Sequence, residues 1–121
     1  MTNFKELHIW QRSHQFVLEI YFITKSFPKD ELFGLTSQMR RSAASIPTNI
    51  AEGFGRNSDA EINRFLVISQ GSAAELEYQI ILSKDLNYIS TETFDKLNLE
   101  ITEIRKMLNS FAQKVRQRIR E

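Results

Sequence analysis

The chain has 121 residues, a formal net charge of +1 and no cysteine. Without cysteine it can form no disulfide, iron–sulfur cluster or thiolate-bound zinc site. Its length predicts one domain over residues 1–121, and its four glycines and two prolines favour helices over a many-turned β fold. The polar start does not resemble a signal peptide and no window is apolar enough to cross a membrane, so we expect a cytoplasmic protein.

The first predicted helix covers about residues 5–26 and is apolar on more than one side. Helical spacing gives an inner face of six residues, namely Leu7, Trp10, Val17, Ile20, Tyr21 and Thr24. Four other apolar residues fall elsewhere around the helix: Ile9, Phe16, Phe22 and Ile23. Such a helix needs more than one partner, either within the chain or from a neighbouring subunit. Phe27 and Pro28 end it.

The second predicted helix occupies most of residues 35–56, the stretch around which the chain is organised. Small side chains between residues 42 and 51 allow another backbone to come close. Pro47 lacks an N–H for the carbonyl of Ala43, so we expect a bend there. Gly53 suits the position just after the end of a helix.

The third predicted helix starts at a capping box formed by Ser58 and Glu61 and runs to about residue 86. It contains a second patch of small residues at 71–74. A glycine inside a helix costs about 1 kcal/mol relative to alanine. We therefore expect the second helix to pack against Gly71.

The fourth predicted helix begins at Ser90 or Thr91 and has the clearest pattern in the chain. Six apolar residues follow each other at intervals of three and four: Leu97, Ile101, Ile104, Leu108, Phe111 and Val115. Because the connections between the four helices are short, successive helices should be antiparallel. The sequence therefore predicts an all-α, up-down-up-down four-helix bundle.

Catalytic and metal-binding motifs are not found. A di-iron bundle needs Glu-x-x-His motifs, whereas His8 and His14 stand six residues apart on one helix. There is no phosphate-binding loop and no nucleophile elbow. We expect Asn49, Glu52, Ser72 and Glu75 to form a structural hydrogen-bond network between helices. The alternative is an acid/base site at the same residues, which needs a buried cleft. We predict no catalytic residue, metal or cofactor.

Basic residues are the remaining candidates for function. Residues 105–121 carry six basic side chains against Glu121 alone. Candidates for phosphate contacts in the whole chain are Arg40, Arg41, Arg56, Arg64, Lys114, Arg116, Arg118 and Arg120. Cations also stabilise the C-terminus of a helix, so these basic residues need not contact phosphate. Two hypotheses about the function therefore stay open. The first is a non-enzymatic oligomer that binds RNA or DNA, and the second is a protein-interaction scaffold.

Three segments of the sequence resemble a known family. They are FP-x-x-E-x-x-GL-x-x-Q over residues 27–38, SIP-x-NIAEG-x-GR over residues 45–56 and GS-x-x-E-x-E over residues 71–77. They are similar to segments of the 23S ribosomal RNA intervening-sequence proteins, also called four helix bundle proteins. The motif residues that look structural are Pro47, Asn49, Glu52, Gly53, Gly71, Ser72 and Glu75.

The resemblance covers about residues 7–108 and implies a bacterial protein. Some relatives are encoded inside insertions in large-subunit ribosomal RNA genes. It also implies a left-handed antiparallel bundle that assembles into a homopentamer. A similar pentameric bundle, the accessory variability determinant of diversity-generating retroelements, binds nucleic acid. The resemblance implies no enzymatic activity and transfers no catalytic role to any residue.

Overall fold

The computed structural model describes residues 3–120 and contains only helices in that range. The four α-helices are α1 (His8–Thr24), α2 (Leu35–Phe54), α3 (Asp59–Asp85) and α4 (Thr91–Arg120). Two short 3-10 helices, η1 (Phe4–Glu6) and η2 (Lys29–Glu31), precede α1 and α2. The predicted all-α class and the four predicted helices are confirmed.

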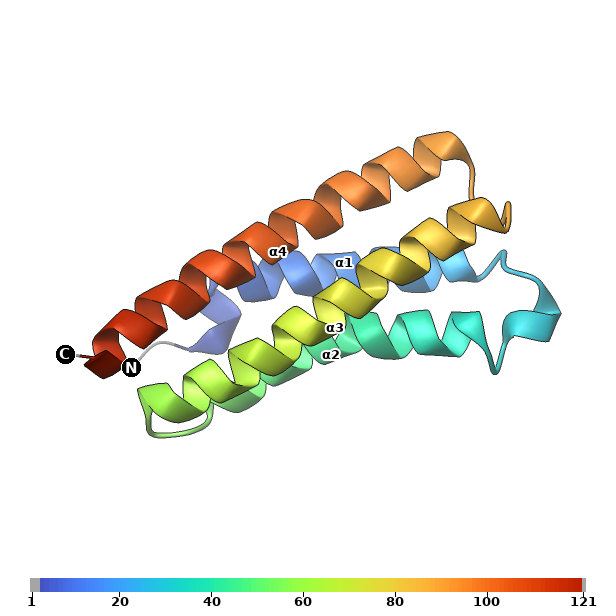
Figure 1. Cartoon of the computed structure of the whole chain (residues 1–121). Coiled ribbons are helices and arrows are strands. Elements are labelled where there is room, and N and C mark those ends of the chain that lie inside the picture. Colours follow the sequence, from blue (N-terminus) through green and yellow to red (C-terminus); the bar gives the residue numbers. More distant parts are fainter. Residues whose placement is uncertain (1–2, 121) are drawn as a thin grey trace.

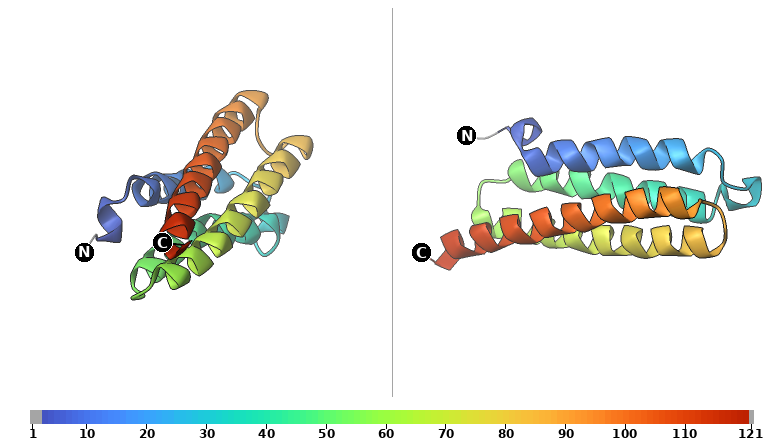
Figure 2. Two further views of the ribbon diagram at one scale, coloured as in Figure 1. Left: turned by 60° about the vertical axis from the view of Figure 1, so that its left-hand side comes forward. Right: turned by 90° about the horizontal axis from the view of Figure 1, so that it is seen from above.

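Each helix packs against two others. Close backbone contacts join α1 to α2, α2 to α3, α3 to α4 and α1 to α4, whereas the backbones of α1 and α3, and those of α2 and α4, stay further apart. Consecutive helices run in opposite directions along one long axis (Figures 1 and 2). The turn between α2 and α3, η1 and the last turn of α4 therefore lie at the same end of the molecule (Figure 1).

The core is an apolar interior to which all four helices contribute. On α4 the completely buried residues are Leu97, Ile101, Ile104, Leu108, Ala112 and Val115. The prediction that Phe111 occupies this series was wrong in part, since Phe111 packs against the core but Ala112 takes the completely buried position. Phe111 is half-buried beside it, and its ring packs against that of Phe54 at a centroid distance of 5.6 Å.

The predicted inner face of α1 was partly wrong. The buried residues of α1 are Ile9, Ser13, Phe16, Ile20 and Thr24. Tyr21, expected inside, is exposed, while Ile9 and Phe16, expected elsewhere, lie in the core. Leu7, Trp10 and Val17 pack against the edge of the core. Spacing alone cannot choose the inner face of a helix that is apolar on several sides, because several faces satisfy the same periodicity.

The start of α2 is capped by a side chain from η2. The Glu31 carboxylate accepts a hydrogen bond from the Leu35 N–H at 3.1 Å and another from the Tyr88 hydroxyl at 2.8 Å. A Cβ at position 34 would lie 2.7 Å from Glu31 Oε1, so Gly34 leaves the space that the carboxylate occupies. Because Tyr88 lies in the α3–α4 turn, this cap also ties two turns together.

The predicted starts of α3 and α4 match the structure. Ser58 Oγ accepts a hydrogen bond from the Glu61 N–H at 3.1 Å, and Ser90 Oγ accepts one from the Thr93 N–H at 3.1 Å. The Glu61 carboxylate does not complete the capping box, because it pairs with Arg64 instead. These hydroxyls satisfy backbone N–H groups that have no partner within their own helix.

Two glycines do not have the roles expected of them. Gly53 does not follow the end of α2, which continues to Phe54. It is buried where a Cβ would lie 3.1 Å from Phe65 Cβ and 3.4 Å from Ile62 Cα, so it allows α3 to approach closely. Gly71 is exposed, and no atom lies within 4 Å of the position of its absent Cβ. The prediction that α2 packs against Gly71 was therefore wrong.

Two leucines on α4 give a matched test of the fold. Leu108 is completely buried, whereas Leu99 is 66% exposed. Leu108→Asp places an unpaired charge in the apolar interior and should lower the free energy of unfolding by about 4 kcal/mol or more. Leu99→Asp should cost less than about 1 kcal/mol. Urea unfolding followed by circular dichroism measures both, and equal losses would contradict the assignment of the core.

The Glu31 cap predicts a dependence of stability on pH. Hydrogen bonds from the Leu35 N–H and the Tyr88 hydroxyl stabilise the carboxylate and lower the pKa of Glu31 below its ordinary value. The stability they provide is therefore complete above the ordinary pKa of an unfolded glutamate and is lost as the pH falls through the folded pKa.

Glu31→Gln should thus have a lower urea midpoint than the wild type at neutral pH, and this difference should shrink as the solution is acidified. Tyr88→Phe removes one of the two bonds and should remove only part of the pH dependence. A wild-type advantage that stays constant down to strongly acidic pH would contradict the assignment.

Candidate functional site

A row of polar side chains joins α2 to α3. The hydroxyls of Ser45 and Ser72 lie 2.7 Å apart, and Asn49 Nδ2 donates to both the carbonyl and the hydroxyl of Ser45 at 2.8 and 2.9 Å. One turn away, Ser42 Oγ donates to Glu75 Oε1 at 2.7 Å. Each of these groups is satisfied by a neighbour within the fold, which is a structural arrangement.

The residues considered as an acid/base site do not converge. Glu52 was predicted to join this polar row, but it forms an exposed ion pair with Arg56 at 2.9 Å instead. Glu75 is exposed along the side of α3. No two carboxylates of the predicted set meet in a cleft. Within residues 3–120, no cluster of three or more histidine, aspartate and glutamate side chains could hold a metal ion.

Arg40 contributes to the packing of α1 on α2. Its Nε donates to Thr24 Oγ1 at 2.9 Å, its Nη2 donates to the carbonyl of Tyr21 at 3.3 Å, and its guanidinium lies 4.8 Å from the centre of the Tyr21 ring. Arg41, the next residue, is exposed on the other side of α2 and forms no ion pair within the described range. It lines a polar groove of about 510 Å³ that also contains Glu75.

The other six basic candidates come from the α2–α3 turn and from the parts of α3 and α4 that lie at the same end of the molecule (Figure 1). Three of them are paired with carboxylates. Arg56 pairs with Glu52, Arg64 with Glu61 at 2.9 Å, and Arg118 with Asp59 at 3.1 Å. The last pair joins the C-terminal turn of α4 to the first turn of α3.

Lys114, Arg116 and Arg120 have no ion pair or side-chain hydrogen bond with any residue in the described range. Lys114 and Arg120 are exposed, and Arg116 is half-buried. They lie within the last two turns of α4, on different sides of the helix, and we call these three residues the α4 basic cluster. The structure thus divides the eight predicted phosphate contacts between this end of the molecule and a separate location at Arg40 and Arg41.

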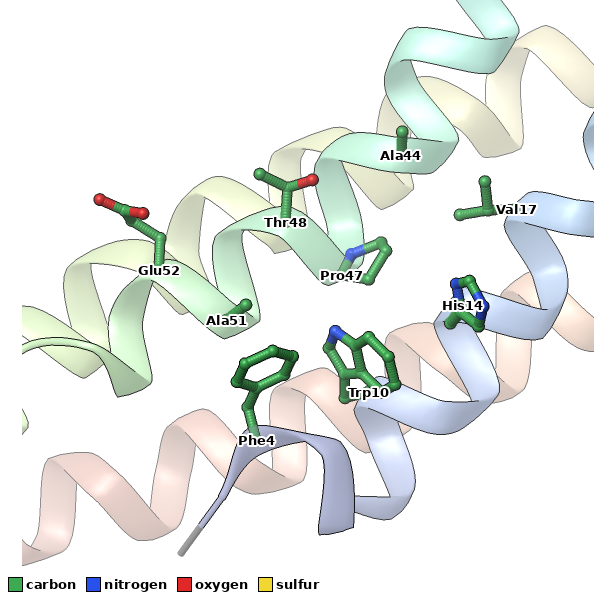
Figure 3. Close-up of a pocket in the computed structure, with 9 residues that line it drawn as sticks. All are labelled: Phe4, Trp10, His14, Val17, Ala44, Pro47, Thr48, Ala51 and Glu52. Atoms are coloured by element: carbon green, nitrogen blue, oxygen red, sulfur yellow. The ribbon is translucent and has the colours of Figure 1, made fainter.

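An aromatic groove between α1 and α2 was not predicted from the sequence (Figure 3). Trp10 lies at its centre. The Trp10 ring stacks on the His14 ring at 5.2 Å and meets the Phe4 ring edge-on at 5.1 Å. Opposite these rings, α2 presents four small residues, namely Ala44, Pro47, Thr48 and Ala51, and Glu52 lies at the rim.

The groove has a volume of about 490 Å³. The four-residue spacing of Trp10 and His14 places both rings on one side of α1, and this spacing was the available sequence signal. With one carboxylate and one imidazole among mainly apolar atoms, the groove offers few of the convergent polar groups typical of a small-molecule site.

Within residues 3–120, no helix is both long and apolar enough to cross a membrane. The comparison with curated proteins finds no match. A solved structure of a protein of unknown function from the S23 ribosomal protein family of Bacteroides thetaiotaomicron VPI-5482 is similar, with 29% sequence identity and a TM-score of 0.79. The match covers 87% of this chain and 95% of that chain. The family model of the 23S rRNA-intervening sequence proteins matches residues 5–110. The chain therefore belongs to the 23S rRNA-intervening sequence protein family.

Proposed function

We propose that this protein is a non-enzymatic, cytoplasmic subunit of a homo-oligomer that binds RNA or DNA through phosphate contacts. The proposed assembly is a homopentamer in which each subunit is a left-handed, up-down-up-down four-helix bundle. The observation that carries the nucleic-acid proposal is the α4 basic cluster, because Lys114, Arg116 and Arg120 have no carboxylate partner in the described range.

The chemistry of the cluster suits phosphate. Arginine forms two parallel hydrogen bonds to phosphate oxygens, and lysine adds a compact charge. The ion pair between Arg118 and Asp59 holds this turn of α4 against α3, so the cluster sits on an ordered helix. One such cluster makes few contacts, but an oligomer presents several copies and raises the avidity without any new contact.

The second candidate function is a protein-interaction scaffold. It is favoured by the large apolar side chains that the described surface exposes on α1, α3 and the η2–α2 turn. In that case the basic cluster only stabilises the C-terminus of α4 through the helix dipole. Purification of the protein with one other protein, in amounts unchanged by nuclease treatment, would favour the scaffold.

Reversing two charges of the α4 basic cluster tests the nucleic-acid proposal. Lys114→Glu combined with Arg120→Glu should weaken binding to single-stranded DNA and structured RNA at least tenfold at low salt. It should also reduce the dependence of affinity on salt, because fewer counterions are released. Fluorescence anisotropy with labelled oligonucleotides across a salt series measures both quantities.

The matched control is Lys29→Glu combined with Lys96→Glu. It changes the net charge equally. Lys29 lies in η2, and Lys96, which pairs with Glu19 at 3.8 Å, lies in the second turn of α4; η2 and the start of α4 are at the opposite end of the molecule (Figure 1). The control should retain most of the affinity. Equal losses of affinity in the two variants would indicate a response to net charge alone. The proposal would be eliminated if the wild-type protein bound neither single-stranded DNA nor structured RNA at low salt.

A further inference from the structure

Helix α3 carries a second apolar stripe on the side opposite the core. Five residues at intervals of four and three form it, namely Val67, Gly71, Ala74, Tyr78 and Ile81. Tyr78 is 60% exposed, and Val67 and Ile81 are exposed as well. Intervals of four and three are typical of a helix that packs along another helix. We call these five residues the α3 stripe.

Contacts within the subunit occupy both flanks of this stripe and leave it uncovered. On one flank, Ser72 and Glu75 bond to α2. On the other flank, Glu77 pairs with Arg105 of α4, and Gln70 donates to Asn109 of α4 at 2.7 Å. The stripe lies between these two flanks, so no helix of the same subunit can cover it.

Gly71, the second residue of the stripe, has no role in the packing of one subunit. Glycine inside a helix lowers helix stability relative to alanine. Gly71 faces open space, because no atom beyond its own turns of α3 lies within 4 Å of its absent Cβ. A close approach of something outside the subunit would account for a residue without a side chain at this point.

Helix α1 carries a matching uncovered face. Leu18 is 51% exposed and Phe22 is 72% exposed, and Lys25 follows them at the next position of the same face. The flanks of α1 are again occupied by its own subunit. Arg40 of α2 covers Tyr21 on one flank, and Arg12 pairs with Glu100 of α4 at 2.8 Å on the other. We call Leu18, Phe22 and Lys25 the α1 face.

We propose that the α1 face of one copy of this chain packs in parallel on the α3 stripe of the next copy. This inference rests on the proposed self-association and specifies its interface. In this packing, Leu18 lies beside Ala74 and Tyr78, and Phe22 lies beside Tyr78 and Ile81. Gly71 lies one turn before Ala74, where its missing side chain lets the neighbouring α1 backbone come close.

The charges at the ends of the two faces agree with this parallel packing. Lys25 follows the apolar pair of α1, and Asp85 follows Ile81 on α3. Both are exposed, neither forms an ion pair within the described range, and both lie at the same end of the molecule (Figure 1). Parallel helices from two copies therefore bring Lys25 beside Asp85 of the next copy.

The placement of the two faces makes the contact head-to-tail. Helices α1 and α3 have no close backbone contact and stand at opposite corners of the fold. Every copy can therefore pack its α1 face on one neighbour and its α3 stripe on another. Contacts of this kind form closed rings when the rotation between copies closes. A contact between two α3 stripes would leave Phe22 uncovered on every copy.

Single substitutions on each face test the interface. Phe22→Glu and Tyr78→Glu alter exposed side chains, so both variants should fold with the helical circular dichroism of the wild type. Each should reduce the oligomer seen by sedimentation velocity to a subunit of 14.2 kDa. Leu99→Glu, on an exposed position of α4 outside both faces, is the matched control and should keep the wild-type mass.

Mixing the two variants separates a head-to-tail contact from a symmetric one. Phe22→Glu retains an intact α3 stripe, and Tyr78→Glu retains an intact α1 face. An equimolar mixture should therefore form a heterodimer and nothing larger. A Phe22→Glu variant that remains fully oligomeric would indicate a contact between α3 stripes and would overturn the proposal.

A charge exchange tests the register of the contact. Lys25→Asp and Asp85→Lys should each weaken assembly at least tenfold, and the double variant should recover most of it. If the wild type assembles but neither face variant changes its mass, the interface is wrong while self-association stands. If the wild type sediments as a monomer at all concentrations, both the assembly and this interface are refuted.

Discussion

The close approach of α3 to α2 is the constraint on which the rest of the structure depends. Two features allow it. Gly53 leaves space where a Cβ would lie 3.1 Å from Phe65 Cβ, and the hydroxyls of Ser45 and Ser72 bond to each other at 2.7 Å. The polar groups at this contact satisfy one another, so the two helices approach closely without leaving these groups unpaired. Ser69 adds a hydrogen bond to the carbonyl of Ile46 at 2.9 Å, which fixes the register of the two helices.

Helix α2 meets this constraint while packing on two further sides. Its apolar residues, such as Met39 and Ile50, enter the core. Its small residues on another side form one wall of the aromatic groove (Figure 3), and Arg40 binds the end of α1. Because α2 borders α3, the apolar core and α1 on different sides, each side needs a different kind of side chain. This requirement explains the unusual composition of residues 35–56 through packing.

The sequence predicted the four helices because each has a periodic apolar face and a recognisable start, as at Ser58. It could not predict which side of α1 is inside, since Tyr21 and Phe16 satisfy helical spacing on different faces. The sequence also led us to expect that α2 packs against Gly71, and the subunit contains no such contact. Both errors have one cause. The position of a residue on its own helix is local information, whereas the presence of a neighbour depends on the packing of distant segments. The same limit applied to the arginines, because Arg118 finds its carboxylate partner on another helix.

The two proposals constrain each other through the direction of the helices. If the α1 face packs in parallel on the α3 stripe, all copies in a ring point the same way along its axis. The C-terminal ends of α4 then lie on one rim of the ring, and every copy adds Lys114, Arg116 and Arg120 to that rim. Phosphates on a nucleic acid are regularly spaced charges, and a rim with repeated basic clusters can bind several of them at once. An antiparallel contact would divide the clusters between two rims. Whether the helices of neighbouring copies pack parallel or antiparallel therefore determines whether three basic residues per copy are sufficient to bind nucleic acid.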